Sequence, residues 1–193
     1  MGTEDQKKWD EKHAGRHSHD APSSFLHEVL DSRSWTIQPG RALEIATGKG
    51  RNALLLAERG FQVDAMDISP VALEEARKIA RARALDINFV ETDLGGAEIA
   101  TAAYDLVVNF NFLQRDLIAR MKVALKPGGR VVFETFLIDQ RVLGHPHNPS
   151  YLLGHNELLD LFRGFRVLYY REGLIVEQEK PAYKARLFAQ KVP

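Results

Sequence analysis

The stretch Glu44-Ile45-Ala46-Thr47-Gly48-Lys49-Gly50-Arg51-Asn52-Ala53 decides the fold of this chain. It begins in the short apolar run Arg41–Ala46, which predicts a strand, and it leads into Ala53–Ala57, whose spacing predicts a helix. The two glycines let the backbone turn tightly and approach a ligand closely. The first turn of the helix offers unpaired N–H groups to a carboxylate or phosphate. The stretch therefore predicts a ligand-binding turn between a strand and a helix, although a plain connecting turn fits the glycine pair equally well.

Strands and helices alternate outward from this turn. We expect a helix capped by Ser69, with Pro70 in its first turn. We expect parallel strands, several of them nearly continuous apolar runs, at Phe61–Met66, Ile87–Glu91, Tyr104–Asn109 and Arg130–Phe136. Two later strands, Phe165–Tyr170 and Tyr183–Lys191, should pair antiparallel at one edge. This order predicts an α/β fold, a Rossmann-like αβα sandwich with helices on both faces of a mostly parallel sheet.

Two aspartates stand at the ends of neighbouring predicted strands, beside the glycine turn. Asp67 ends the second strand, where a carboxylate can accept hydrogen bonds from ribose hydroxyls. Asp93 ends the third strand, where it can reach the amino group of an adenine. Each could instead cap a turn, a common role of aspartate. Their joint position predicts an adenosine site at the carboxyl ends of the strands.

The same turn also fits the dinucleotide fingerprint G-x-G-x-x-A, so an NAD(P)-linked oxidoreductase is the alternative. Three features favour another nucleotide. Glu44 lies inside the first strand, Asp93 stands where an adenine edge would be read, and the chain has no second large domain for a hydride-transfer substrate.

These motifs resemble those of class I S-adenosylmethionine-dependent methyltransferases. Leu43 to Gly50 is similar to their first motif, whose usual form is acidic-x-Gly-x-Gly-x-Gly, and Asp67-Ile68-Ser69 and Asp93-Leu94 resemble the second and third. The run Tyr104–Val108 and the turn Leu125–Gly129 are similar to the fourth strand and to the turn before the fifth. The opening Trp9–His13 and the stretch Gly144–Glu157 resemble the tellurite-resistance-like subgroup of small-molecule methyltransferases.

This resemblance implies a seven-stranded sheet of order 3-2-1-4-5-7-6 with the last strand antiparallel. It implies S-adenosylmethionine as cofactor and one domain over residues 1–193, with an N-terminal helical cover at 1–30 and a substrate-side lid at 137–164. The residues it assigns to the cofactor are Trp9, His13, Glu44, Ala46, Gly48, Gly50, Asn52, Asp67, Ile68, Asp93, Leu94, Asn109 and Phe110.

One residue departs from the family pattern. Ala46 stands where the first glycine of the motif is usual, and its methyl group could crowd the methionine end of the cofactor. We expect binding to survive. A non-catalytic protein that binds S-adenosylmethionine is a further alternative.

The expected reaction is methyl transfer to a small-molecule acceptor by in-line displacement. The acceptor should lie above Asn109–Arg115, under a lid from Ile138 to Leu153. Candidate contacts there are Arg115, Arg141, His145, His147 and Tyr151, of which Arg115, His147 and Tyr151 are our catalytic candidates. All of these could instead only order the loop by hydrogen bonds.

Composition excludes several other classes. Lysine plus arginine equals aspartate plus glutamate at 26 each, so nothing in the charge balance favours nucleic acid or an anionic membrane as a partner. There is no cysteine, which excludes disulfides and thiolate chemistry. His13, His17 and His19 lie in a polar leader without a completing carboxylate set, so we expect no metal site. No signal peptide or membrane span is recognisable, and we expect a cytoplasmic protein.

Overall fold

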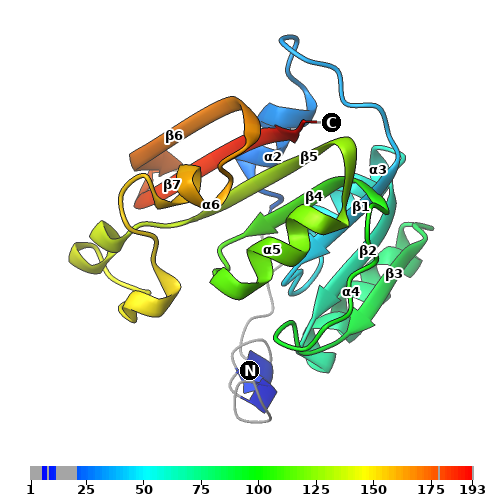
Figure 1. Ribbon diagram of the computed structural model, residues 1–193. Coiled ribbons are helices and arrows are strands. Elements are labelled where there is room, and N and C mark those ends of the chain that lie inside the picture. Colours follow the sequence, from blue (N-terminus) through cyan, green and yellow to red (C-terminus); the bar gives the residue numbers. More distant parts are fainter. Residues whose placement is uncertain (1–5, 8, 12–20, 178, 193) are drawn as a thin grey trace. The chain divides into compact units, whose positions relative to one another are not determined.

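The computed structural model describes residues 6–7, 9–11, 21–177 and 179–192. The chain divides into two compact units, Met1–Ala100 and Thr101–Pro193, which we call the first and second unit. Figure 1 labels their helices and strands. None of the helices in the described ranges is long and apolar enough to cross a membrane.

The first unit contains three parallel strands with helices between them. Its elements are α2 (Ser24–Leu30), β1 (Arg41–Ile45), α3 (Arg51–Glu58), β2 (Gln62–Asp67), α4 (Pro70–Ala82) and β3 (Ile87–Glu91). Strand β2 pairs with both β1 and β3. Helix α4 begins as expected, because the Ser69 side chain accepts a hydrogen bond from the N–H of Ala72 and Pro70 occupies the first turn. Gln6, Lys7 and Trp9–Glu11 are also helical.

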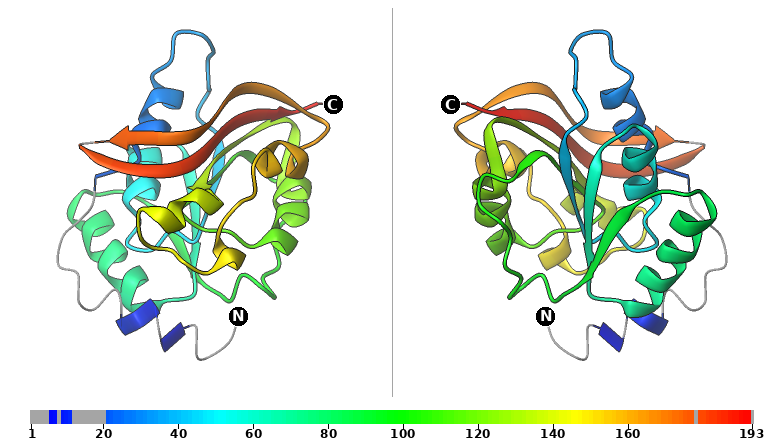
Figure 2. Two further views of the ribbon diagram at one scale, coloured as in Figure 1. Left: turned by 90° about the vertical axis from the view of Figure 1, so that its left-hand side faces the viewer. Right: turned by 90° about the vertical axis from the view of Figure 1, so that its right-hand side faces the viewer.

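The second unit contains the remaining strands. Its elements are β4 (Tyr104–Phe110), α5 (Arg115–Ala124), β5 (Leu125–Phe136), η1 (Ile138–Val142), η2 (Pro149–Tyr151), α6 (Glu157–Leu161), β6 (Phe165–Glu177) and β7 (Lys180–Lys191). Strands β4 and β5 are parallel, and β7 is antiparallel to both β5 and β6. Figure 2 shows β6 and β7, in orange and red, running side by side over their whole length.

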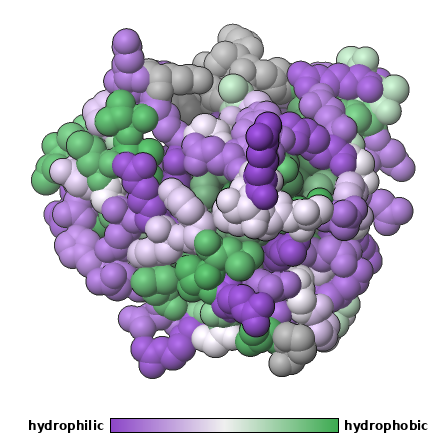
Figure 3. All heavy atoms as spheres, turned by 90° about the horizontal axis from the view of Figure 1, so that it is seen from above, coloured by the Kyte–Doolittle hydropathy of each residue, from purple (hydrophilic) through white to green (hydrophobic). Residues whose placement is uncertain are grey.

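The strand order is β3-β2-β1-β4-β5-β7-β6, which confirms the predicted Rossmann-like methyltransferase sheet. The cores of the units are apolar. Leu43, Ile45 and Leu73 are completely buried in the first unit, and Leu106, Leu187 and Phe188 in the second. The face of the protein in Figure 3 is mainly hydrophilic, with hydrophobic residues gathered in a few separate patches.

Three details differ from the expectations. β3 is an apolar run, but its residues are only partly buried or exposed, because it is the edge strand of the sheet. β5 includes Pro127, Gly128 and Gly129, which were expected to form only a turn. β6 continues to Glu177, seven residues beyond the predicted end at Tyr170, because the part after Gly173 pairs with the first residues of β7.

Candidate functional site

The turn after β1 lies beside the carboxyl end of β2, and the Asp67 side chain links them by hydrogen bonds. The Asp67 carboxylate accepts hydrogen bonds from the N–H of Gly48 at 2.7 Å and from the N–H of Ser69 at 2.9 Å. It is only 7% exposed. Both bonds are charge-assisted, and each fixes one of its oxygens. The sequence-predicted carboxylate and glycine turn are therefore brought together.

The three strand ends of the first unit are in register. The N–H of Thr47 donates to the carbonyl of Met66 at 2.9 Å, and the N–H of Thr92 donates to the carbonyl of Asp67 at 2.9 Å. Asp93 therefore follows a strand end that lies directly beside Asp67. The Asp93 carboxylate accepts from the N–H of Gly95 at 2.8 Å, so it also performs the turn-capping role.

The glycine turn uses backbone conformations that favour glycine. Gly48 and Gly50 have φ of 55° and 76°, in the left-handed region. A Cβ at Gly50 would lie 3.0 Å from the Cβ of Ala76, so this position is also closed to side chains by packing. Ala46 has φ of 52°, a conformation in which an alanine is strained. The residue that departs from the family pattern thus occupies a position where the backbone itself favours glycine.

A buried chain of hydrogen bonds connects the glycine turn to the residues before and after it. Glu44 is 2% exposed and accepts from the Thr47 hydroxyl at 2.5 Å and from the Asn52 amide at 3.0 Å. The Asn52 side-chain oxygen accepts from the N–H of Ser23, the residue before α2. Burial raises the pKa of Glu44 to about 7, against the lowering effect of its hydrogen bonds to Thr47 and Asn52. Glu44 and Asn52 therefore link the turn to the start of α2.

The N-terminal segment contacts the same strand ends. Asp10 accepts a hydrogen bond from the hydroxyl of Ser69, and Gln6 donates to Glu91 at 3.3 Å. Farther along, the Arg51 guanidinium donates to the carbonyl of Ala21 at 3.0 Å. The segment is thus fastened beside β2 and β3 and again at the start of α3. Asp10 was missed from the sequence, because nothing in its surroundings points to a partner 59 residues away.

The other predicted cofactor residues lie at several places. Trp9 is partly buried in the N-terminal helix, and His13 lies outside the described residues. Ile68 is partly buried directly after Asp67, and Leu94 is 2% exposed. Asn109 and Phe110 lie in the second unit, at the carboxyl end of β4, and the Asn109 amide donates to the carbonyl of Phe112 at 2.8 Å.

Arg115, one of the catalytic candidates, binds the loop that follows β5. Its Nε and Nη2 donate to the two carboxylate oxygens of Glu157, at 2.5 and 2.9 Å. Its Nη1 and Nη2 also donate to the carbonyls of Ser150 and Leu152. Glu157 in turn accepts from the N–H of Gly154 at 2.7 Å. The guanidinium holds the pKa of Glu157 below its usual range. Arg115 therefore orders residues 150–157.

The remaining acceptor-side candidates lie on the same loop. His147 is exposed, and its ring centroid is 4.4 Å from that of His145. Tyr151 is partly buried at the end of η2, and Arg141 is exposed in η1. Gln140, which the sequence did not single out, anchors η1, because its side chain accepts from the N–H of Tyr183 at 2.8 Å and donates to the carbonyl of His145 at 3.2 Å.

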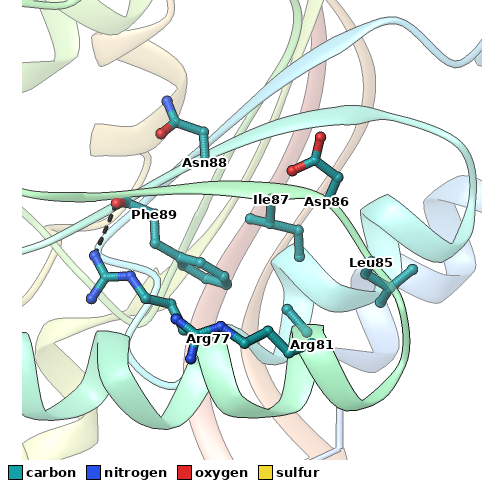
Figure 4. Close-up of a pocket in the computed structure, with 8 residues that line it drawn as sticks. Arg77, Arg81, Leu85, Asp86, Ile87, Asn88 and Phe89 are labelled. Atoms are coloured by element: carbon teal, nitrogen blue, oxygen red, sulfur yellow. Dashed lines mark hydrogen bonds between the residues drawn. The ribbon is translucent and has the colours of Figure 1, made fainter.

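A recess of about 350 Å³ lies elsewhere in the first unit, between the end of α4 and the beginning of β3 (Figure 4). Arg77 and Arg81 border it from α4, and Arg77 donates to the carbonyl of Phe89 at 3.1 Å. Asp86 on its rim balances part of this charge. None of the predicted cofactor residues lines it. In the described ranges, no three histidines or carboxylates are grouped closely enough to hold a metal ion.

Comparison with known proteins finds similarity to methyltransferases. Residues 42–129 match the family described as methyltransferase domain. The demethylmenaquinone methyltransferase of Thermus thermophilus is 38% identical over 106 residues, which are 51% of this chain and 48% of that protein. A probable S-adenosyl-L-methionine-dependent methyltransferase, TehB of Haemophilus influenzae, is 26% identical over 160 residues, 79% of this chain and 55% of that protein. The chain spans about half the length of these curated relatives.

A solved structure gives the same assignment for the fold. The crystal structure of TehB from Haemophilus influenzae superimposes with a TM-score of 0.77 at 21% identity, covering 95% of this chain and 67% of that one. The matched residues 42–129 contain β1, the glycine turn, Asp67 and Asp93, on which the predicted resemblance depends. The match to a methyltransferase domain and the fold imply S-adenosylmethionine as the cofactor. Residues 42–129 thus match the methyltransferase domain family, and the chain is similar to TehB in sequence and in fold.

Proposed function

We propose that this protein binds S-adenosylmethionine at the carboxyl ends of β1, β2 and β3 and transfers its methyl group to a small-molecule acceptor. The observation that carries the proposal is the bond between the Asp67 carboxylate and the N–H of Gly48. It holds an acidic side chain of the second strand against the glycine turn of the first. This is the arrangement that binds a ribose next to a backbone-lined pocket.

The residues of the first unit fit an adenosine. A carboxylate is an acceptor for about four hydrogen bonds, so the side chain of Asp67 is of a type that suits the hydroxyl donors of a ribose. Ile68 and Leu94 are apolar residues that directly follow Asp67 and Asp93, where they suit the faces of a purine ring. The N-terminus of α3, next to Gly50, offers N–H groups to the carboxylate of the methionine portion.

Bound S-adenosylmethionine supplies a methyl group attached to a sulfonium sulfur that departs readily as a neutral thioether, so the leaving group needs no activation by the protein. The protein therefore has to position the two reactants in line and exclude water, and a general base helps only if the acceptor carries a proton. Arg115 contributes by ordering residues 150–157 through Glu157 and two carbonyls. We propose that His147 and Tyr151, on the same loop, contact the acceptor, and that the loop shields it from water.

The neutral charge balance supports a small acceptor over a nucleic acid. The metabolite-sized acceptor and the cysteine-free composition of the chain favour a cytoplasmic location.

Isothermal titration with S-adenosylhomocysteine tests the cofactor site. We expect micromolar binding by the wild type and a loss of at least tenfold in Asp67→Asn, which keeps one acceptor oxygen for the backbone. Asp86→Asn, at the opposite end of β3, is the matched control and should bind like the wild type. No heat with the wild type, or equal affinity in Asp67→Asn, contradicts the proposal.

One observation favours the non-catalytic alternative. Ala46 stands at a left-handed position of the turn, where the family pattern has glycine, so its backbone is strained, and its methyl group would narrow the methionine end of the proposed cofactor site. Transfer of labelled methyl groups to any acceptor excludes this alternative. A parallel fluorescence titration with NADH covers the oxidoreductase alternative, for which binding of NADH without binding of S-adenosylhomocysteine would be decisive.

A further inference from the structure

A group of four charged side chains, three of them buried and one partly exposed, joins β5, β6 and β7 of the second unit. It consists of Glu134 on β5, Glu177 on β6, and Lys184 and Arg186 on β7, and we call it the hairpin charge cluster. Their side chains are 1%, 32%, 11% and 4% exposed, in that order. Arg186 lies opposite Glu134 in the strand register, and Lys184 lies one pleat farther on, opposite Phe136. All four side chains therefore share one face of the sheet.

Each carboxylate oxygen of Glu134 accepts a hydrogen bond from one of the two cations. Its Oε1 accepts from the Lys184 Nζ at 2.7 Å and its Oε2 from the Arg186 Nε at 2.6 Å. Arg186 also donates through Nη2 to Glu177. Arg186 thus lies between two carboxylates and links β7 to both β5 and β6.

Lys184 is bound less completely. An ammonium group has three donors. In the part of the chain that the structure describes, its Nζ makes a hydrogen bond to Glu134 and lies 5.4 Å above the ring centroid of Phe136. The carboxylate of Glu177 is 4.0 Å away, within ion-pair range but beyond hydrogen-bond distance. The Lys184 ammonium therefore has N–H donors left for a ligand next to Glu177, the most exposed member of the cluster.

The place of the cluster matters as much as its charges. Burying ions costs several kcal/mol each, and apolar residues of similar size often stabilise a protein as well or better. A cluster of this kind is therefore poor evidence for a purely stabilising role. Glu134 and Phe136 belong to the last three residues of β5, and open α/β sheets bind ligands outside the carboxyl ends of their strands.

We infer that the hairpin charge cluster is the subsite for an anionic group of the methyl acceptor, with Lys184 as its binding residue. The acceptor is then a small molecule that carries a carboxylate or a comparable oxyanion. Glu134 orients Lys184 by a hydrogen bond, and Glu177 is the internal carboxylate whose charge competes with the acceptor. This inference rests on the proposed function for the existence of an acceptor.

Thermal unfolding with two pairs of probes tests the subsite. The pairs are 3-mercaptopropionate with its methyl ester, and 4-hydroxybenzoate with its methyl ester, each measured with and without saturating S-adenosylhomocysteine. We expect at least one acid to raise the unfolding midpoint of the wild type more than its ester does. In Lys184→Met the apparent affinity for that acid should fall at least tenfold, and Lys184→Arg should retain most of it.

Glu177→Gln should change the affinity for the acid in the opposite direction to Lys184→Met. It removes the competing carboxylate while Arg186 keeps Glu134, so the acid should bind several-fold more tightly than to the wild type. Lys126→Met is the matched control, because Lys126, among the first residues of β5, forms an ion pair with Asp105 on β4, and its replacement should not affect acid binding.

The inference is overturned if neither acid is preferred over its ester in the wild type, or if Lys184→Met keeps the preference. It is also overturned if Glu177→Gln weakens acid binding. Titration with S-adenosylhomocysteine alone reports on the proposed function, and the acid series without it reports on the subsite. Failure of one is therefore distinguishable from failure of the other.

Discussion

Replacing Ala46 by glycine should stabilise the protein, although glycine usually costs stability. Ala46 has φ of 52°, and an L-residue in the left-handed region is strained by about 1–2 kcal/mol. Glycine relieves this strain, but its greater freedom in the unfolded chain costs about 0.4–1 kcal/mol. The expected net gain in the free energy of unfolding is about 0.5–1 kcal/mol. For a chain of this size it raises the unfolding midpoint by about 1–4 °C.

Ala84 offers a control with the same backbone and a different place. It also has φ of 52°, and it is exposed just after α4, away from the glycine turn. Differential scanning calorimetry of Ala46→Gly and Ala84→Gly should show gains of similar size. Titration with S-adenosylhomocysteine should separate them, because only Ala46→Gly removes a methyl group from the expected methionine pocket and should bind several-fold more tightly.

Two results would refute this reasoning. If Ala46→Gly lowers the midpoint while Ala84→Gly raises it, the alanine methyl makes contacts worth more than the strain. If both variants gain stability but neither changes the affinity for S-adenosylhomocysteine, Ala46 does not border the cofactor.

Three further predictions concern residues that support the site. Gly50→Ala should lower the free energy of unfolding by about 1–3 kcal/mol in calorimetry, since its Cβ would meet Ala76 at 3.0 Å and its φ is 76°; an unchanged midpoint would contradict the packing. Because the pKa of Glu44 is raised from 4.5 to about 7, the wild type should lose stability as the pH rises from 4.5 through 7, by up to about 3 kcal/mol. Glu44→Gln should flatten that dependence in thermal melts, and a parallel pH profile for both proteins would show that Glu44 titrates normally. Arg115→Ala and Glu157→Gln should both speed limited proteolysis within residues 150–157, because each breaks the ion pair that orders this loop. Cleavage of both variants at the wild-type rate would show that Arg115 does not order the loop.

The alternation of strands and helices and the glycine turn were predictable because their signals are local, whereas the strand order came from the family resemblance. The Ser69-Pro70 helix start and the Gly48–Gly50 turn each depend on residues within a few positions, and the structure confirms both. The position of Asp67 beside the glycine turn followed from the rule that neighbouring parallel strands end at the same edge, whereas its hydrogen bond from the N–H of Gly48 was not predicted.

The acceptor side was less predictable because its contacts join distant parts of the chain. Arg115 and Glu157 are 42 residues apart, and sequence alone could not distinguish a catalytic arginine from one that orders a loop. The sequence carries one signal for the hairpin charge cluster: Lys184 and Arg186 alternate with the apolar residues Ala185, Leu187 and Ala189 in the part of β7 that is buried. Charges at that spacing indicate one charged face of a buried strand.

Strand β7 has a consequence for how the protein opens. It is hydrogen-bonded on both edges, to β5 from Lys184 to Gln190 and to β6 over its whole length. Amide protons at Leu187, Phe188 and Ala189 should therefore exchange with deuterium only when the second unit unfolds, whereas those of the edge strand β3 should exchange in smaller fluctuations. Comparing the exchange rates at β7 with those at the doubly paired β2 would show whether the two units melt together or one at a time.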